Sequence, residues 1–213
     1  MQLYNEDCYE GIKKIPDKSI DLVITDPPYE LSNNGYGSTK EGKWYYRPYA
    51  LEISKTNLAN GIDLKILDEF VRVMKHINIY LWCNKEQIYD YIDYFVKQHN
   101  CNFEILVWAK PNPAPFVNGH YLKDKEYCLF FWEKGIKIGG TYDTLKTVYV
   151  KNSNVGDKKN YLHPTIKPLD IIKNLVSNSC NRGGGGIRLL YGLWNYWSRL
   201  QRARNGFYRF RDR

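Results

Sequence analysis

The residues best suited to do chemistry stand together as Asp26-Pro27-Pro28-Tyr29, directly after the apolar run 20–24. The amino group of a nucleobase is a poor nucleophile because its lone pair is delocalised into the ring. Two acceptors that take its two hydrogens would pull the nitrogen toward a tetrahedral, reactive shape. The Asp26 carboxylate can be one acceptor and the Pro27 carbonyl the other, because proline fixes the local backbone. Tyr29 then offers a flat face on which an extruded base could stack.

A plain turn at the end of a strand is the alternative for this motif, since Asp and Pro are common turn residues. At average residue usage the string arises by chance on the order of once in a thousand chains of this length. The motif alone therefore favours a function without establishing one.

The elements that must hold the motif alternate between strand and helix along the chain. Helices are expected at 9–15, 62–75 and 85–99, where apolar residues recur at helical spacing, and at 169–179, where a proline stands at the start. Strands are expected at 20–24, 77–83, 103–108 and 127–132, the last two as an antiparallel pair, and 139–160 reads as irregular. This alternation predicts an α/β sheet.

Composition indicates one folded domain, because 213 residues with 43% hydrophobic content can bury a full core. The N-terminus carries no basic-then-apolar signal and no apolar run is long enough for a membrane helix, so we expect a cytoplasmic protein without membrane contact. Five cysteines, without a CxxC pair, are expected to be buried reduced thiols rather than metal ligands.

The positive charge is concentrated at one end of the chain. The formal net charge is +8, and residues 187–213 supply +6 of it through seven arginines, no lysine and one acid. The body of the chain is therefore only weakly basic, and the switch from lysine to arginine needs an explanation.

A long polar segment at 30–60 is a candidate insert for recognising the target DNA, since long loops in compact domains are often functional. Its basic residues could contact phosphates and its aromatic residues could stack or wedge, as base extrusion requires. The candidate DNA-binding residues are Lys40, Lys43, Trp44, Tyr45 and Arg47. An aromatic cluster that simply packs on the sheet explains the same composition equally well.

With a second motif, His163-Pro164-Thr165-Ile166-Lys167-Pro168, the chain resembles a known family. It is similar over most of 3–182 to amino-directed DNA methyltransferases that use S-adenosylmethionine, in the β-type order where the catalytic motif precedes the cofactor motif. The resemblance also covers Asp7-Cys8, the block 15–29, the strand end 108–113, and Glu126.

The resemblance implies a Rossmann-like sheet on which Asp26, Pro27, Pro28 and Tyr29 hold a flipped base of double-stranded DNA. It also implies cofactor contacts from Asp7 and Cys8 at the adenine end and from His163, Thr165, Lys167 and Pro168 at the methionine end. In that family, Asp at the first motif position goes mostly with adenine as the target. Cytosine amino methylation and a non-catalytic DNA-binding remnant stay open, as does a homodimer. His163 could instead cap the following helix, and Lys167 could be a solvated side chain.

The pattern breaks after 182, where a strand ending in Asp-x-Phe-x-Gly-Ser-Gly should follow. The chain instead reads Ile187-Arg188-Leu189-Leu190-Tyr191-Gly192-Leu193-Trp194-Asn195-Tyr196-Trp197-Ser198. Residues 194–197 must be encoded TGG-AAY-TAY-TGG, which one base further on reads Gly, Thr or Ile, Thr or Ile, Gly. The neighbouring codons permit D-S-F-M-G-S-G-T-T-G-V-A-C-K-E-L, and those of 206–212 permit G-F-I-G-F-E-I, which together match a cofactor loop, helix and second strand.

We therefore predict a methyltransferase domain at 1–182 and an out-of-frame tail at 183–213 that begins at the four glycines 183–186. The first cofactor-binding strands are expected to be missing from the sheet. This lineage would use S-adenosylmethionine, but the chain itself is expected to bind it weakly or not at all.

Overall fold

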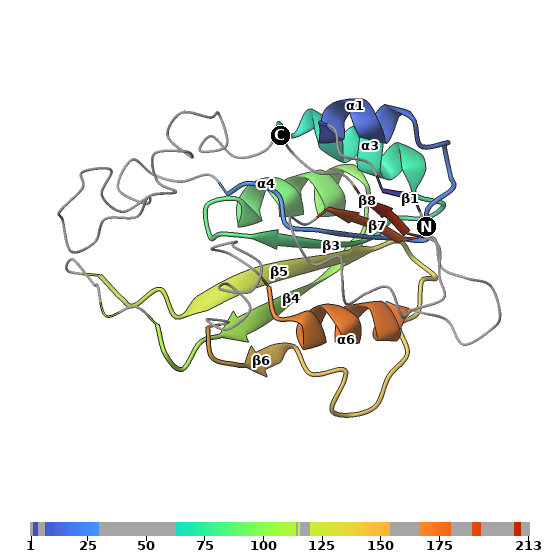
Figure 1. Cartoon of the computed structure of the whole chain (residues 1–213). Coiled ribbons are helices and arrows are strands. Elements are labelled where there is room, and N and C mark those ends of the chain that lie inside the picture. The colour runs from blue at the N-terminus through green and yellow to red at the C-terminus, as the bar shows by residue number, and fades with distance from the viewer. Residues whose placement is uncertain are drawn as a thin grey trace.

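A computed structural model describes residues 2–3, 7–29, 63–113, 115, 120–153, 167–179, 189–192 and 207–209. These residues form one eight-stranded sheet with helices on both faces (Figure 1). The predicted α/β class, a Rossmann-like methyltransferase sheet, is confirmed. No helix in the described ranges is both long and apolar enough to cross a bilayer.

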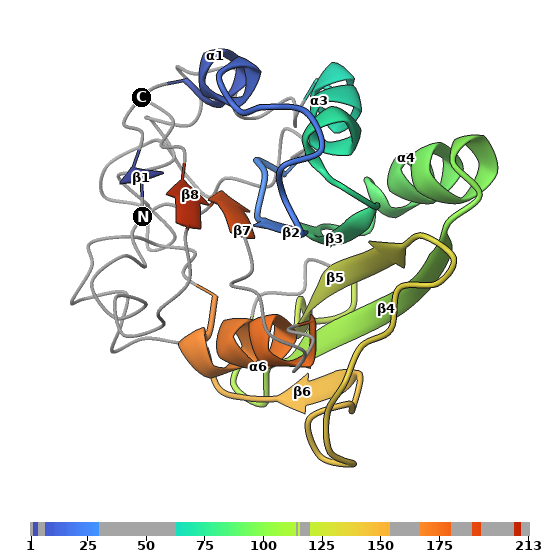
Figure 2. The same cartoon turned by 90° about the vertical axis from the view of Figure 1, so that its right-hand side faces the viewer.

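The strand order is β1-β8-β7-β2-β3-β5-β4-β6, which Figure 2 shows from the edge with β1 to the edge with β6. All neighbours pair in parallel except β5, which runs antiparallel to both β3 and β4. The strands are β1 Gln2–Leu3, β2 Leu22–Thr25, β3 Asn78–Cys83, β4 Asn102–Ala109, β5 Lys125–Trp132, β6 Val148–Val150, β7 Leu189–Gly192 and β8 Phe207–Arg209.

Helices α1 (Cys8–Lys13), α3 (Lys65–Val73) and α4 (Ile88–Ile92) cover one face of the sheet, and α6 (Leu169–Ser179) covers the other (Figures 1 and 2). A π-helix, η2 (Asp93–Gln98), continues α4, so the predicted helix over 85–99 is present but not uniformly α-helical. The helix predicted at 169–179 is confirmed in its bounds.

Side chains of the central strands point alternately to the two faces of the sheet and fill both layers of the core. Val23 and Ile79 pack under α1 and α3, while Leu22, Ile24 and Tyr80 pack under α6. Because successive side chains of a strand point to opposite faces, a strand buried on both faces reads as a continuous apolar run. This is why the sequence pattern predicts β2 and β3.

Two expectations about strands are corrected. The stretch 139–160, expected to be irregular, contains β6, a three-residue edge strand rich in β-branched residues that pairs with β4. The first cofactor-side strands were expected to be missing, yet β7 and β8 occupy positions between β2 and β1. An apolar segment such as 189–191 can pair with the open edge of a buried parallel strand whatever its origin.

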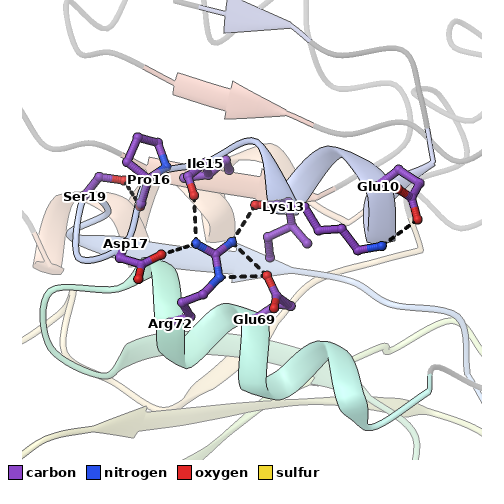
Figure 3. Close-up of polar contacts among 9 residues, drawn as sticks. Glu10, Lys13, Ile15, Pro16, Asp17, Ser19, Glu69 and Arg72 are labelled. Carbon is purple, nitrogen blue, oxygen red and sulfur yellow. Dashed lines mark hydrogen bonds and ion pairs between the residues drawn. The ribbon is translucent and has the colours of Figure 1, made fainter.

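Arg72, in the last turn of α3, ties the end of α1 to the rest of the domain (Figure 3). Its guanidinium donates to the carbonyls of Ile12 and Ile15, both at 2.9 Å. It also pairs with Glu69 at 2.7 Å and with Asp17. The carbonyls at the end of a helix lack partners within the helix. The Ile12 carbonyl also accepts the Ile15 N–H at 3.0 Å, whereas Arg72 supplies the donor that the Ile15 carbonyl would otherwise take from water.

We expect Arg72→Met to lower the free energy of unfolding by about 1–3 kcal/mol, because it leaves the half-buried Ile15 carbonyl without its donor among the described residues. The Ile12 carbonyl loses one of its two donors and keeps the Ile15 N–H. Urea unfolding followed by circular dichroism measures the change. Lys13→Met is the matched control, since the pair that Lys13 makes among the described residues is an exposed one with Glu10, and its loss should leave the midpoint unchanged. Equal midpoints for wild type and Arg72→Met would contradict this role.

Candidate active site

The candidate site forms where several strands meet one edge of the sheet. Asp26 follows Thr25, the last residue of β2, which pairs with Leu81 of β3. Because β5 runs antiparallel, its beginning, with Glu126, lies at the same edge as the end of β4. Lys110 follows β4 and reaches Glu126 there. Open α/β sheets bind their ligands at this carboxyl edge.

Lys167 joins the two carboxylates of this edge. Its Nζ lies 2.6 Å from Oδ2 of Asp26 and 3.1 Å from Oε2 of Glu126. The Lys167 side chain is only 1% exposed and that of Asp26 only 8%. A buried charge needs such partners, since an unpaired one costs several kcal/mol.

Lys110 completes the charge balance by pairing with Oε1 of Glu126. The cluster thus contains two lysines, Lys110 and Lys167, and two carboxylates, Asp26 and Glu126, and is neutral when all four are ionised. Lys110, Glu126 and Lys167 come from separate parts of the chain, so the cluster depends on the sheet being assembled.

One oxygen of Asp26 has no such partner. Oδ1 is buried and accepts no hydrogen bond from the described residues, whereas Oδ2 is held by Lys167. A buried acceptor without a donor costs about 1–3 kcal/mol, so native proteins seldom retain one without a reason. Oδ1 is therefore suited to accept a hydrogen bond from a ligand.

Two aromatic rings flank the Lys167 ammonium. Its Nζ lies 5.1 Å from the ring centroid of Tyr29 and 5.3 Å from that of Trp82, within the range of cation–π attraction. The Tyr29 hydroxyl donates a long hydrogen bond of 3.5 Å to Oε2 of Glu126. Burial, followed by the charges of Asp26 and Glu126, raises the pKa of Tyr29 well above its usual range, so the hydroxyl remains a donor.

Gln87 fixes the backbone of the motif. Its Nε2 donates to the Pro28 carbonyl at 3.2 Å and to the Tyr91 hydroxyl at 3.3 Å, and its Oε1 accepts from the Asn84 N–H. The side chain is buried, so these bonds hold the turn rigidly. The sequence analysis missed Gln87, and the only available signal was a polar residue at the start of a helix that follows a buried strand.

The pKa values in the cluster reflect competition between burial and charge. Burial raises the pKa of Asp26, against the opposing effect of the Lys167 ammonium. Burial acts in the opposite sense on Lys167, but Asp26 and Glu126 raise its pKa overall. For Glu126, burial opposes ionisation, yet Lys167 and Lys110 together lower its pKa to about 2.

The predicted cofactor residues fall into two groups. Asp7 caps the N-terminus of α1, with Oδ1 accepting from the N–H groups of Tyr9 (2.8 Å) and Glu10 (3.3 Å), and Cys8 is the first residue of that helix. Lys167 and Pro168 are buried just before α6. His163 and Thr165 lie outside the described residues, as do the predicted DNA-binding residues Lys40, Lys43, Trp44, Tyr45 and Arg47.

Three of the cysteines, Cys83, Cys101 and Cys128, are buried free thiols, as predicted. Cys8 is half-buried, which corrects the expectation of full burial: it begins a surface helix. Cys180 lies outside the described residues.

Acid should weaken the fold through Glu126. Its pKa is lowered from 4.5 to about 2, so the stability that it contributes is complete above 4.5 and is lost as the pH falls toward 2. We expect the free energy of unfolding to fall more steeply over this window in the wild type than in Glu126→Gln. Urea unfolding at a series of pH values measures both slopes, and parallel curves would contradict the ion pairs.

The chain matches known proteins at two levels. The family model described as DNA methylase (N6_N4_Mtase) matches residues 20–188. The Type II methyltransferase M2.MboI of Moraxella bovis is 24% identical over 204 residues, covering 84% of this chain and 71% of that protein. M2.DpnII of Streptococcus pneumoniae is 24% identical over 211 residues, covering 86% and 74%.

Solved structures show the same fold at low identity. The M1.HpyAVI–SAM complex has a TM-score of 0.66 and 17% identity, covering 100% of this chain and 94% of that one. The cytosine-N4-specific PvuII DNA methyltransferase has a TM-score of 0.64 and 13% identity, covering 100% and 82%. The predicted enzyme class and its cofactor, S-adenosylmethionine, are confirmed at the level of the family. Since the family match extends over most of the sequence and includes the Asp26 motif, the chain belongs to the DNA methylase family.

Proposed function

We propose that this chain carries the catalytic half of an adenine-specific DNA methyltransferase, which methylates the exocyclic amino group of a base flipped out of double-stranded DNA. The observation that carries the proposal is Oδ1 of Asp26, a buried carboxylate oxygen at the carboxyl edge of the sheet for which no described residue supplies a donor. The cytoplasm is the compartment that we propose for it.

The chain's own residues prepare the amino nitrogen. Oδ1 of Asp26 accepts one N–H of the target amine and the Pro27 carbonyl accepts the other, which localises the lone pair on nitrogen. S-adenosylmethionine supplies the methyl group. Asp26 or water would take the proton that the amino nitrogen sheds on methylation. No covalent bond to the protein is needed.

Tyr29 is the residue proposed to stack on the extruded base. It is half-buried, so part of it remains accessible from the edge of the sheet. Base–aromatic stacking is worth about 1–3 kcal/mol, which offsets part of the unstacking that base flipping requires. The insert 30–60, including Lys40, Lys43, Trp44, Tyr45 and Arg47, is proposed to contact the DNA.

Adenine is the preferred target because the motif begins with Asp26, as it mostly does in adenine-directed members that the chain resembles. Cytosine amino methylation is the alternative, since the fold is shared with the cytosine-N4-specific PvuII enzyme. Both bases present an amino group that Asp26 and Pro27 could hold, so the difference must come from the rest of the pocket.

The cofactor half of the site does not fit its ligand as the chain stands. Gly192, the last residue of β7, pairs with Thr25, so the chain leaves β7 at the same edge as Asp26 leaves β2. A glycine loop that lets the cofactor approach the backbone would belong there. The sequence instead continues Leu193-Trp194-Asn195-Tyr196. We propose that residues 183–213 are read out of frame and that the adjacent frame encodes this loop.

We expect this 213-residue chain to show no micromolar binding of S-adenosylmethionine by calorimetric titration. A frame-restored chain, in which the adjacent-frame sequence replaces the tail, should bind it. Micromolar binding by the original chain would refute the proposed loss. Resequencing the codons of 183–186 provides the independent check, and an intact frame without Gly-Ser-Gly-Thr-Thr beside it would contradict the frame shift.

In the frame-restored chain, Asp26→Asn should lower methyl transfer by about 10²-fold or more, because an amide offers one acceptor and adds donors at this position. The measurement is transfer of labelled methyl groups to defined DNA, followed by digestion to nucleosides. N6-methyladenine is the expected product, and N4-methylcytosine would select the alternative. Asp170→Asn, an exposed change on α6, is the control and should keep wild-type activity.

A further inference from the structure

We propose that Lys167 is a positioning residue for methyl transfer: its ammonium holds Oδ2 of Asp26 so that Oδ1 is presented to the amino group of the target base. This inference rests on the proposed function and gives Lys167 a role different from a contact with the cofactor. The pair spans 141 positions in the sequence and joins the end of β2 to the residue two positions before α6.

The ammonium determines what Asp26 can do. A carboxylate with an 8% exposed side chain would tend to take up a proton, because burial disfavours the charged form. A protonated Asp26 would carry an O–H donor where the reaction needs an acceptor. Lys167, at 2.6 Å, supplies the compensating charge and occupies one oxygen, which leaves the other as the acceptor.

Lys167 is itself held in place by a chain of ion pairs. Lys110 contacts Oε1 of Glu126, and Oε2 of Glu126 lies 3.1 Å from the Lys167 ammonium. Glu126 thus competes with Asp26 for the same cation while preventing Lys167 from turning away. The charges alternate from Lys110 through Glu126 and Lys167 to Asp26, the carboxylate proposed to hold the target amine.

In the part of the chain that the structure describes, the other titratable groups that interact with Asp26 remain neutral. The Tyr29 hydroxyl interacts with both carboxylates, and the thiols of Cys83 and Cys128 interact electrostatically with Asp26. Burial raises the pKa of Cys83 to about 12 and raises that of Cys128 well above its usual range. The charges that can tune Asp26 in this cluster are therefore those of Lys167 and Glu126.

The test follows the titration of Asp26 in the 213-residue chain by carbon NMR of labelled aspartate carboxyl groups, with Asp26→Asn used to assign the signal. Lys167→Met should shift the Asp26 titration to higher pH, because the compensating cation is lost. Glu126→Gln should shift it to lower pH, because a competing anion is removed and Lys167 serves Asp26 alone. A role for Lys167 that is limited to packing α6 against the sheet, without charge coupling to Asp26, predicts neither of these opposite shifts.

Two further variants complete the design. Lys167→Arg keeps the positive charge, so Asp26 should titrate near its wild-type position in that variant. Glu126→Gln still tests the coupling if Lys167→Met does not fold. Lys151→Met removes an exposed lysine that pairs with Asp170 and should leave the Asp26 titration unchanged. Unshifted Asp26 signals in folded Lys167→Met and Glu126→Gln would overturn the inference.

The two proposals fail separately in these experiments. If Asp26 shifts as expected but the frame-restored chain never methylates DNA, the proposed function is wrong while the coupling between Lys167 and Asp26 stands. If methyl transfer occurs but the titration of Asp26 does not respond to Lys167, the positioning role is wrong and the proposed function stands.

Discussion

The buried ion pair between Asp26 and Lys167 is the interaction on which the rest of the site depends. It joins the end of β2 to the start of α6, so it forms only when α6 is packed on the sheet. Removing one partner of a buried ion pair leaves the other charge buried and unpaired, which costs about 3–5 kcal/mol of stability in measured cases. The domain therefore couples its packing to the ionisation of the residue at the centre of its proposed chemistry.

The antiparallel strand β5 explains how the remaining groups reach this pair. A parallel strand would place its first residues at the far edge of the sheet, away from Asp26. Because β5 is reversed, Glu126 near its start lies beside the ends of β3 and β4, where Lys110 can neutralise it. The reversal thus supplies the second carboxylate that keeps Lys167 in position.

Local pattern predicted the elements better than it predicted the site. The helix at 169–179 followed from the proline at its start, and the antiparallel pair β4 and β5 from two closely spaced apolar runs joined by a proline-rich loop. The motif around Asp26 was found from its chemistry alone. By contrast, Lys167 looked like either a solvated lysine or a cofactor contact, because nothing local reveals a partner 141 positions away.

The sequence did not predict the roles of Gln87 and Glu126 for the same reason. The contacts of both residues depend on which strands become neighbours in the sheet. In the C-terminal segment 183–213, by contrast, the backbone pairs as a strand without the residues expected of a cofactor site. Its segment 189–192 pairs with β2 although the sequence lacks the glycine loop, so a strand-forming segment alone does not make a cofactor site. Backbone pairing needs only apolar character, whereas binding a cofactor needs particular residues at particular positions.

A crystal structure of the frame-restored chain with DNA that contains the target base is the decisive measurement. We expect the amino nitrogen of the flipped base within hydrogen-bond distance of Oδ1 of Asp26, about 2.7–3.2 Å, with Lys167 still on Oδ2. A base bound elsewhere, or one that displaces Lys167 and takes Oδ2, would contradict this expectation.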